Sequence, residues 1–310
     1  PWAVTWMGDA VVVWNAITPF LTAFRESGDV VTSTGTEVSG DWFAHPFREP
    51  LFRIDFPYQM GEEDVTLRLN GLDSGHVGLV LQDDERFEER DIDAPEAYLT
   101  VWDSTLSVVD TLTMLPAPPM YLKQVRGEIY AYAWETFTPR SQWTAGDGWY
   151  ATHVREQPSV TVKRMSGEEV LEVTWPDSLK EVAWEDRENR VDWYEIDRDG
   201  PISKEGKRRY ASEWIEFSEN APEVMALYGW GRCLWISPFS SADYSNGTGL
   251  TLMIVHVDSR WEPKIVRIPR VGSRLRAASP RGMITTYEDD LGVQLLELYE
   301  VPGLDCTPVG

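Results

Sequence analysis

The sequence repeats one local pattern: a short apolar strand, a tight polar turn and a second apolar strand. Most of the turns carry Gly, Asp or Asn, which favour tight β-turns. Nine such hairpins are expected, over Trp2–Trp14, His76–Ile92, Tyr98–Thr113, Tyr121–Trp134, Trp149–Arg164, Lys180–Ile196, Val224–Ile236, Leu250–Ile268 and Gly282–Tyr299. Hairpins in series predict an all-β repeat architecture. Only Phe20–Ser27 suggests helix, as a turn or two that ends at Gly28.

Pairing successive hairpins gives four-stranded units at a regular spacing. The units begin near His76, Tyr121, Lys180, Val224 and Gly282, which are 45, 59, 44 and 58 residues apart. A four-stranded blade needs roughly 40–50 residues. The first and last hairpins have no neighbouring hairpin to pair with. Joining these two in one sheet would complete a further unit from both ends of the chain and would remove an open sheet edge.

In this pattern the chain resembles the β-propeller repeat proteins. The resemblance implies a single domain over residues 1–310, with about six four-stranded blades closed by the N- and C-terminal hairpins. It carries no subfamily signature, because only Trp102-Asp103 matches the Trp-Asp pair that WD repeats contain in each blade. Tandem β-sandwiches also place short strands at regular spacing, and they are the alternative fold.

The net charge of the chain indicates which classes of binding partner are disfavoured. The 310 residues include 28 Lys and Arg against 51 Asp and Glu, which gives a net charge of −23. This charge disfavours binding to nucleic acid and to anionic lipid. No apolar stretch is long enough to predict a transmembrane helix. Since acidic surfaces are common in extracellular proteins, we expect an extracellular or periplasmic location.

The chain has two cysteines, Cys233 and Cys306. Two are too few for a multi-disulfide scaffold or a four-cysteine metal site. They could form one bridge that pins the C-terminal tail to the sheet carrying Cys233. They could also be two buried free thiols, and the sequence leaves both readings open.

One segment is a candidate calcium site. Glu195, Asp197 and Asp199 alternate along the chain, Gly200 follows, and Ser203 takes the ninth position. Alternating carboxylates before a glycine can curl around a hard cation. The segment resembles the calcium loops of EF-hands and integrin-type propeller hairpins, although its first ligand is Glu and the bidentate Glu at position twelve is missing. An ordinary Asp-Gly hairpin turn is the alternative.

A basic segment stands out against the acidic composition. Residues 260–281 contain seven basic residues and one acid, Glu262. Four arginines at its centre are candidate binding residues: Arg267, Arg270, Arg274 and Arg276. The segment could pair internally with carboxylates of neighbouring blades. It could also be a docking surface for an acidic partner or for another copy of the chain.

No nucleophile elbow or phosphate-binding glycine loop is recognisable. We therefore predict a non-enzymatic interaction module that binds a protein or a glycan, with no required cofactor and calcium as the one candidate. A carbohydrate-active hydrolase that uses paired carboxylates is the first alternative. Its candidate acids are Asp9, Asp55, Glu135 and Glu185. A structural subunit of a surface assembly is the second alternative, and the oligomeric state stays open.

Overall fold

The structure is a computed structural model, which describes fifteen segments of the chain. These are residues 3–15, 20–35, 69–72, 76–82, 96–116, 121–125, 128–133, 139–175, 217–221, 223–239, 249–258, 263–271, 274–278, 282–288 and 293–307. Every regular element in these segments is a β-strand. No described helix is long and apolar enough to cross a membrane.

The strands form six antiparallel sheets, named I to VI here, and each sheet takes its strands consecutively from the chain. Sheet I contains β1 (Ala3–Met7), β2 (Ala10–Asn15), β3 (Phe20–Arg25) and β4 (Val30–Gly35). Sheet II contains β5 (Leu69–Gly71), β6 (Val77–Gln82), β7 (Glu96–Trp102) and β8 (Val108–Pro116). Sheet III contains β9 (Tyr121–Val125) and β10 (Glu128–Ala133).

The remaining three sheets continue in the same way. Sheet IV contains β11 (Gln142–Gly146), β12 (Trp149–His153), β13 (Ser159–Arg164) and β14 (Glu169–Thr174). Sheet V contains β15 (Val224–Trp230), β16 (Cys233–Pro238), β17 (Gly249–His256) and β18 (Lys264–Val271). Sheet VI contains β19 (Arg274–Ala278), β20 (Gly282–Glu288) and β21 (Gln294–Glu300).

Seven of the nine predicted hairpins are confirmed as pairs of neighbouring strands. They are β1–β2, β7–β8, β9–β10, β12–β13, β15–β16, β17–β18 and β20–β21. The first turn shows why the local pattern is informative. Met7 pairs with Ala10, so only Gly8 and Asp9 connect the strands. Gly8 has φ of 60°, a conformation that glycine adopts at little cost and that suits a two-residue hairpin turn.

Two hairpin predictions and the helical prediction have other outcomes. The predicted partner of β6 is wrong, because β6 pairs with β7 at Glu96–Trp102 and not with a strand ending at Ile92. The Lys180–Ile196 hairpin lies outside the described residues. The helical turn expected at Phe20–Ser27 is wrong, since Phe20–Arg25 is strand β3. Alternate side chains of β3 are buried, which is the periodicity of a strand and not of a helix.

The prediction that both terminal hairpins share one sheet is also wrong. The N-terminal hairpin β1–β2 continues into β3 and β4 within sheet I, whereas the C-terminal hairpin β20–β21 belongs to sheet VI. Local pairing closes a much shorter loop than pairing between the two chain ends, and short loops cost less entropy. The described residues therefore form separate antiparallel sheets and no closed one.

Five of the sheets stack face to face in the order I, II, IV, V, VI, and a core lies at each junction. Trp14 and Val12 of sheet I pack with Val77 and Trp102 of sheet II. The next two cores join sheet II to sheet IV and sheet IV to sheet V. The last core joins Trp235 of sheet V and neighbouring residues to sheet VI and the C-terminal tail. Each inner sheet is therefore covered on both faces.

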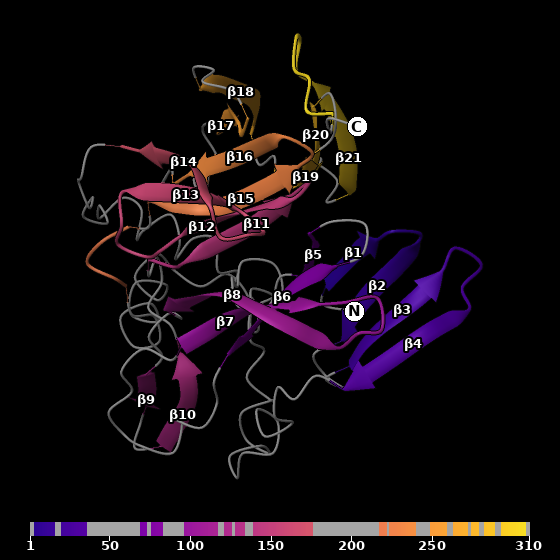
Figure 1. The fold of residues 1–310 in the computed structure, drawn as a ribbon. Helices are drawn as coiled ribbons and strands as arrows, with labels where there is room; N and C mark the ends of the chain where they lie inside the picture. The colour runs from indigo at the N-terminus through magenta and orange to yellow at the C-terminus, as the bar shows by residue number, and fades with distance from the viewer. Residues whose placement is uncertain are drawn as a thin grey trace.

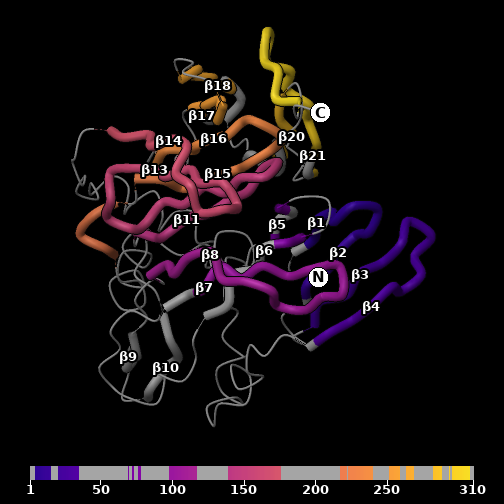
Figure 2. Tube along the Cα trace, in the orientation of Figure 1, coloured from indigo at the N-terminus to yellow at the C-terminus, as the bar shows by residue number. Residues whose placement is uncertain are grey.

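The first strand of each stacked sheet lies near the centre of the array. Along the chain, β1 contacts β5, β5 contacts β11, β11 contacts β15, and β15 contacts β19. Figure 1 shows the sheets fanning outward from this region. The trace in Figure 2 passes around the fan from indigo sheet I to yellow sheet VI. Sheets I and VI are thus the two ends of a radial series.

Candidate functional site

The junction between sheets IV and V is built around Trp149, whose side chain is 2% exposed. Its indole Nε1 donates a hydrogen bond of 2.6 Å to the carbonyl oxygen of Gly231. The ring packs where Gly146 and Gly229 have no side chains, since a Cβ on Gly146 would lie 2.3 Å from the indole. A Cβ on Gly229 would lie 2.1 Å from the Ala145 carbonyl oxygen. Two glycines therefore allow β11 and β15 to approach closely.

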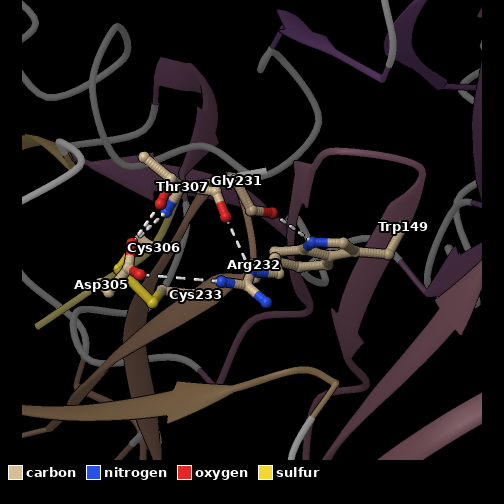
Figure 3. Close-up of a disulfide and its surroundings, with 7 residues drawn as sticks. All are labelled: Trp149, Gly231, Arg232, Cys233, Asp305, Cys306 and Thr307. Atoms are coloured by element: carbon tan, nitrogen blue, oxygen red, sulfur yellow. Dashed lines mark hydrogen bonds and ion pairs between the residues drawn. A yellow bond between two sulfur atoms is a disulfide. The ribbon is translucent and has the colours of Figure 1, made fainter. Parts of the chain in front are cut away.

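The C-terminal tail is fastened to sheet V beside this junction, as Figure 3 shows. Cys306 forms a disulfide with Cys233 at the start of β16. The backbone N–H of Arg232 donates to the Cys306 carbonyl at 3.0 Å, and its Nε donates to the Thr307 carbonyl at 2.7 Å. The guanidinium also lies 3.9 Å from the Asp305 carboxylate. The sequence allowed a bridge or two free thiols, and the structure contains the bridge.

The contacts between the C-terminal tail and sheet V shift the pKa values of Asp305 and His256. The hydroxyl of Thr307 donates to Asp305 and, with the backbone N–H of Thr307, holds the pKa of Asp305 below its usual value. Burial lowers the pKa of His256 on β17, and the positive charge of Arg232 lowers it further. Both shifts favour an ionised Asp305 and a neutral His256. The charged pair that holds the tail is therefore Arg232 and Asp305.

A buried polar pair lies elsewhere on the same junction. His153 of β12 is fully buried, and its Nε2 lies 3.8 Å from the carboxylate of Glu223, just before β15. Its Nδ1 is 3.0 Å from the Ser159 carbonyl. Because a carbonyl only accepts hydrogen bonds, Nδ1 must carry the proton. Burial lowers the pKa of His153 although the Ser159 contact opposes this. The Nε2 atom of the neutral ring is then an acceptor, so His153 and the Glu223 carboxylate lie close together without a hydrogen bond between these two atoms.

The predicted basic segment forms the outer strand of sheet V and the first strand of sheet VI. β18 is the last strand in the order of sheet V. Lys264 and Arg267 are exposed on β18, and Ile265 between them is 54% exposed. Lys264 Nζ donates to the Pro302 carbonyl at 2.5 Å, which ties the start of β18 to the C-terminal tail. We call Lys264 and Arg267 the basic edge.

The other predicted residues are placed only in part. The backbone of Arg270 lies in β18, and that of Arg274 and Arg276 lies in β19. Their side chains are outside the described part of the structure. The candidate calcium ligands Glu195, Asp197, Asp199 and Ser203 all fall in residues 176–216, which are also outside it. In the segments that are described, no three His, Cys, Asp or Glu side chains group as a metal site.

The candidate carboxylates of the hydrolase alternative are not brought together in the described segments. Asp9 is exposed in the β1–β2 turn, while Asp55, Glu135 and Glu185 fall outside those segments. Sequence reasoning missed the partnership of Lys264 with the tail and the role of Arg232. The adjacent Arg232-Cys233 pair was the available signal, because a bridge at Cys233 necessarily brings the tail to Arg232.

No protein-family model matches the sequence, and no curated protein matches it. Three solved structures give distant similarities. One is "KlHsv2 with loop 6CD replaced by a Gly-Ser linker" (8% identity, TM-score 0.32, 94% of this chain and 81% of that chain). A structure from a study of two prolyl endopeptidases has 11% identity and a TM-score of 0.34. Apo AztD from Citrobacter koseri has 8% identity and a TM-score of 0.29.

These similarities cover very different shares of the other proteins. The prolyl endopeptidase match covers 99% of this chain and 33% of that one, and the AztD match covers 95% and 58%. This chain therefore spans about a third of the length of the endopeptidase.

Proposed function

We propose that this chain is a non-enzymatic interaction module that binds the acidic surface of a protein partner through its basic edge. The observation that carries the proposal is the exposure of Lys264, Ile265 and Arg267 on the outer strand β18. Ile265 and Arg267 lie on one face of β18, and Lys264 stands at the start of the strand on the other face. In a chain of net charge −23, these exposed cations on an edge strand create a local field that attracts and orients an acidic partner.

The neighbouring structure supports a rigid surface at this position. Lys264 is tied to the tail at Pro302, and the tail is held by the Cys233–Cys306 bridge. A surface that is already ordered loses less conformational entropy on binding than a mobile one. Arg270 follows Arg267 along β18, and we propose that it extends the same binding surface.

We also propose that the sheets are blades of one propeller-like domain over residues 1–310. Support comes from the contacts between successive first strands and from the shared cores at each junction. Five of the six described sheets share these cores, and we propose that each of the five is one blade. The array is open between sheets I and VI.

Since disulfides persist in oxidising compartments, we propose that the protein is located outside the cytoplasm.

Charge reversal tests the binding proposal. The double variant Lys264→Glu/Arg267→Glu should bind poly-L-glutamate, a probe for an acidic protein surface, at least about tenfold more weakly than wild type, a loss of roughly 1.4 kcal/mol. Wild-type binding should weaken as salt rises from 0.05 to 0.5 M, since added salt screens exposed charges (about a 10 Å screening length at 0.1 M). Surface plasmon resonance at several salt concentrations measures both effects.

The matched control is Arg25→Glu, which reverses an exposed charge at the end of β3 and should leave binding unchanged. Heparin serves as a second probe. Tighter binding to heparin than to poly-L-glutamate would identify an acidic glycan, and not a protein, as the ligand. Equal binding by wild type and the double variant would contradict the proposal. The basic edge would then serve only to protect β18 from strand addition, as charged edge residues often do.

A further inference from the structure

The face of sheet I that points away from sheet II is apolar and uncovered. Val4 is 54% exposed, Trp6 59% and Phe20 47%. The strand register places three half-buried side chains on the same face: Val11, Val13 and Phe24. We call these six residues the outer face of sheet I. The opposite face, with Val12, Trp14 and Leu21, is buried against sheet II. An exposed apolar face of this kind marks an interaction surface.

The sequence of sheet I independently indicates that both faces become buried. β1 reads AVTWM and β2 reads AVVVWN, so apolar residues occupy both alternating sets of positions. Such continuous apolar runs are typical of strands covered on both faces. Sheet I therefore has the composition of an inner sheet, although it stands at one end of the series.

Sheet VI, at the other end, has a matching surface. Leu296 and Leu298 of β21 are 76% and 63% exposed. Leu298 pairs with Ile284 of β20, which is half-buried on the same face. We call these three residues the outer face of sheet VI; the register also places Thr286 and Glu300 on this face. The opposite face holds Met283, which is buried in the core shared with sheet V. The series thus ends in two apolar faces of the kind that pack together at its inner junctions.

We propose that these faces join two copies of the chain, with sheet I of each copy packed on sheet VI of the other. The two ends lie on the same side of the fan in Figure 1, so one two-fold axis can form both contacts at once. Such paired contacts are the usual arrangement in a symmetric dimer. Among the described residues, the side chains of these two outer faces are exposed, and packed cores hold the junctions between I and VI. In the dimer, each copy therefore covers the two exposed outer faces of the other copy.

The available surface fits a dimer. Trp6, Val4, Phe20, Leu296 and Leu298 together expose about 600 Å² per chain, if a fully exposed large apolar side chain contributes about 200 Å². The half-buried members of both faces add to this area. Each partner in an interface of standard size contributes about 800 Å². The two apolar contacts of the dimer therefore supply a large part of the area of a specific interface.

This dimer uses a different surface from the basic edge and depends on salt in the opposite direction. Two chains of net charge −23 repel each other, while the contact faces are apolar. Added salt screens the repulsion and strengthens apolar association. The dimer should therefore become more stable between 0.05 and 0.5 M salt, whereas binding at the basic edge should weaken. Failure of one proposal leaves the other intact.

Sedimentation velocity with point variants tests the dimer. Trp6→Glu and Leu296→Glu should each weaken dimerisation roughly 30-fold or more, as expected for a central interface residue. A mixture of the two variants should regain part of the dimer, because the intact sheet I of one still fits the intact sheet VI of the other. This regain also shows that both variants are folded. The matched control Val109→Glu changes a side chain that is 53% exposed on β8 and should leave the dimer unchanged.

Three results would overturn the proposal. If only one of the two variants is monomeric, the dimer joins identical faces and the pairing of I with VI is wrong. If the mixture of variants regains no dimer, the same conclusion follows. If wild type is monomeric at 0.5 M salt, the faces do not join copies. Protection of Trp6 from oxidation in that monomer would show that the chain closes on itself.

Discussion

Cys306→Ser is expected to lower the free energy of unfolding by about 4 kcal/mol, because the bridge closes a long loop in the unfolded chain. Cys233 and Cys306 are separated by 73 positions in the sequence, and both are fully buried. Without the bridge, the end of the tail is held by Arg232, Asp305 and Thr307 through contacts that contribute little on their own, while Val301 and the Lys264–Pro302 hydrogen bond still hold its start. Urea unfolding followed by fluorescence measures the loss.

The double variant Cys233→Ser/Cys306→Ser is the matched control for the bridge. It should be about as unstable as Cys306→Ser, because either change removes the same covalent link. Wild type unfolded in the presence of a thiol reductant should show a similar midpoint. A loss below about 1 kcal/mol for Cys306→Ser would mean that the tail contributes little to the stability of sheets V and VI.

Gly229→Ala is expected to destabilise the fold by about 3 kcal/mol, at the upper end for an overpacked core position. The added Cβ would lie 2.1 Å from the Ala145 carbonyl oxygen and 3.0 Å from the Trp149 ring. The first of these atoms belongs to the backbone of β11 and cannot move aside by changing rotamer. Sheets IV and V would have to separate, which exposes their shared core. Thermal unfolding by circular dichroism gives the change in stability.

Gly28→Ala is the matched control for this prediction. Gly28 has φ of +88°, and no atom lies within 4 Å of a Cβ at that position. Its substitution therefore measures backbone strain alone, which costs about 1 kcal/mol. If Gly229→Ala costs no more than Gly28→Ala, β11 and β15 do not approach each other as closely as the structure indicates.

Local pairing could be predicted from the sequence because turn chemistry acts over a few residues. Gly8-Asp9 and Asp103-Ser104 both lie at observed turns. Asp103 shows the mechanism, since its carboxylate accepts hydrogen bonds from the backbone N–H groups of Thr105 and Ser107. These bonds and one from the Thr105 hydroxyl hold the pKa of Asp103 below its usual value.

The grouping of hairpins into sheets was harder to predict, because spacing alone does not show which hairpins pair. β3 was read as a helical turn, since Phe20, Leu21 and Phe24 place apolar residues on both faces of a strand and obscure the two-residue period. That composition was also the available signal for the uncovered face of sheet I.

The candidate binding site was partly predictable from the sequence. The basic segment indicates Arg267, but the exposure of Lys264 and Ile265 depends on the position of β18 at the edge of sheet V.

The central claim is that five sheets stack in the order I, II, IV, V, VI and leave the ends of the series uncovered. Hydroxyl-radical footprinting of tryptophans by mass spectrometry tests it most directly, at low salt and low protein concentration, where the monomer dominates. Of the tryptophans in the described segments, Trp6, at 59% exposure, should oxidise fastest, while four tryptophans at the junctions, each no more than 2% exposed, should be protected: Trp14, Trp143, Trp149 and Trp235. Oxidation of any of these four at the rate of Trp6, or protection of Trp6 in the monomer, would contradict the account.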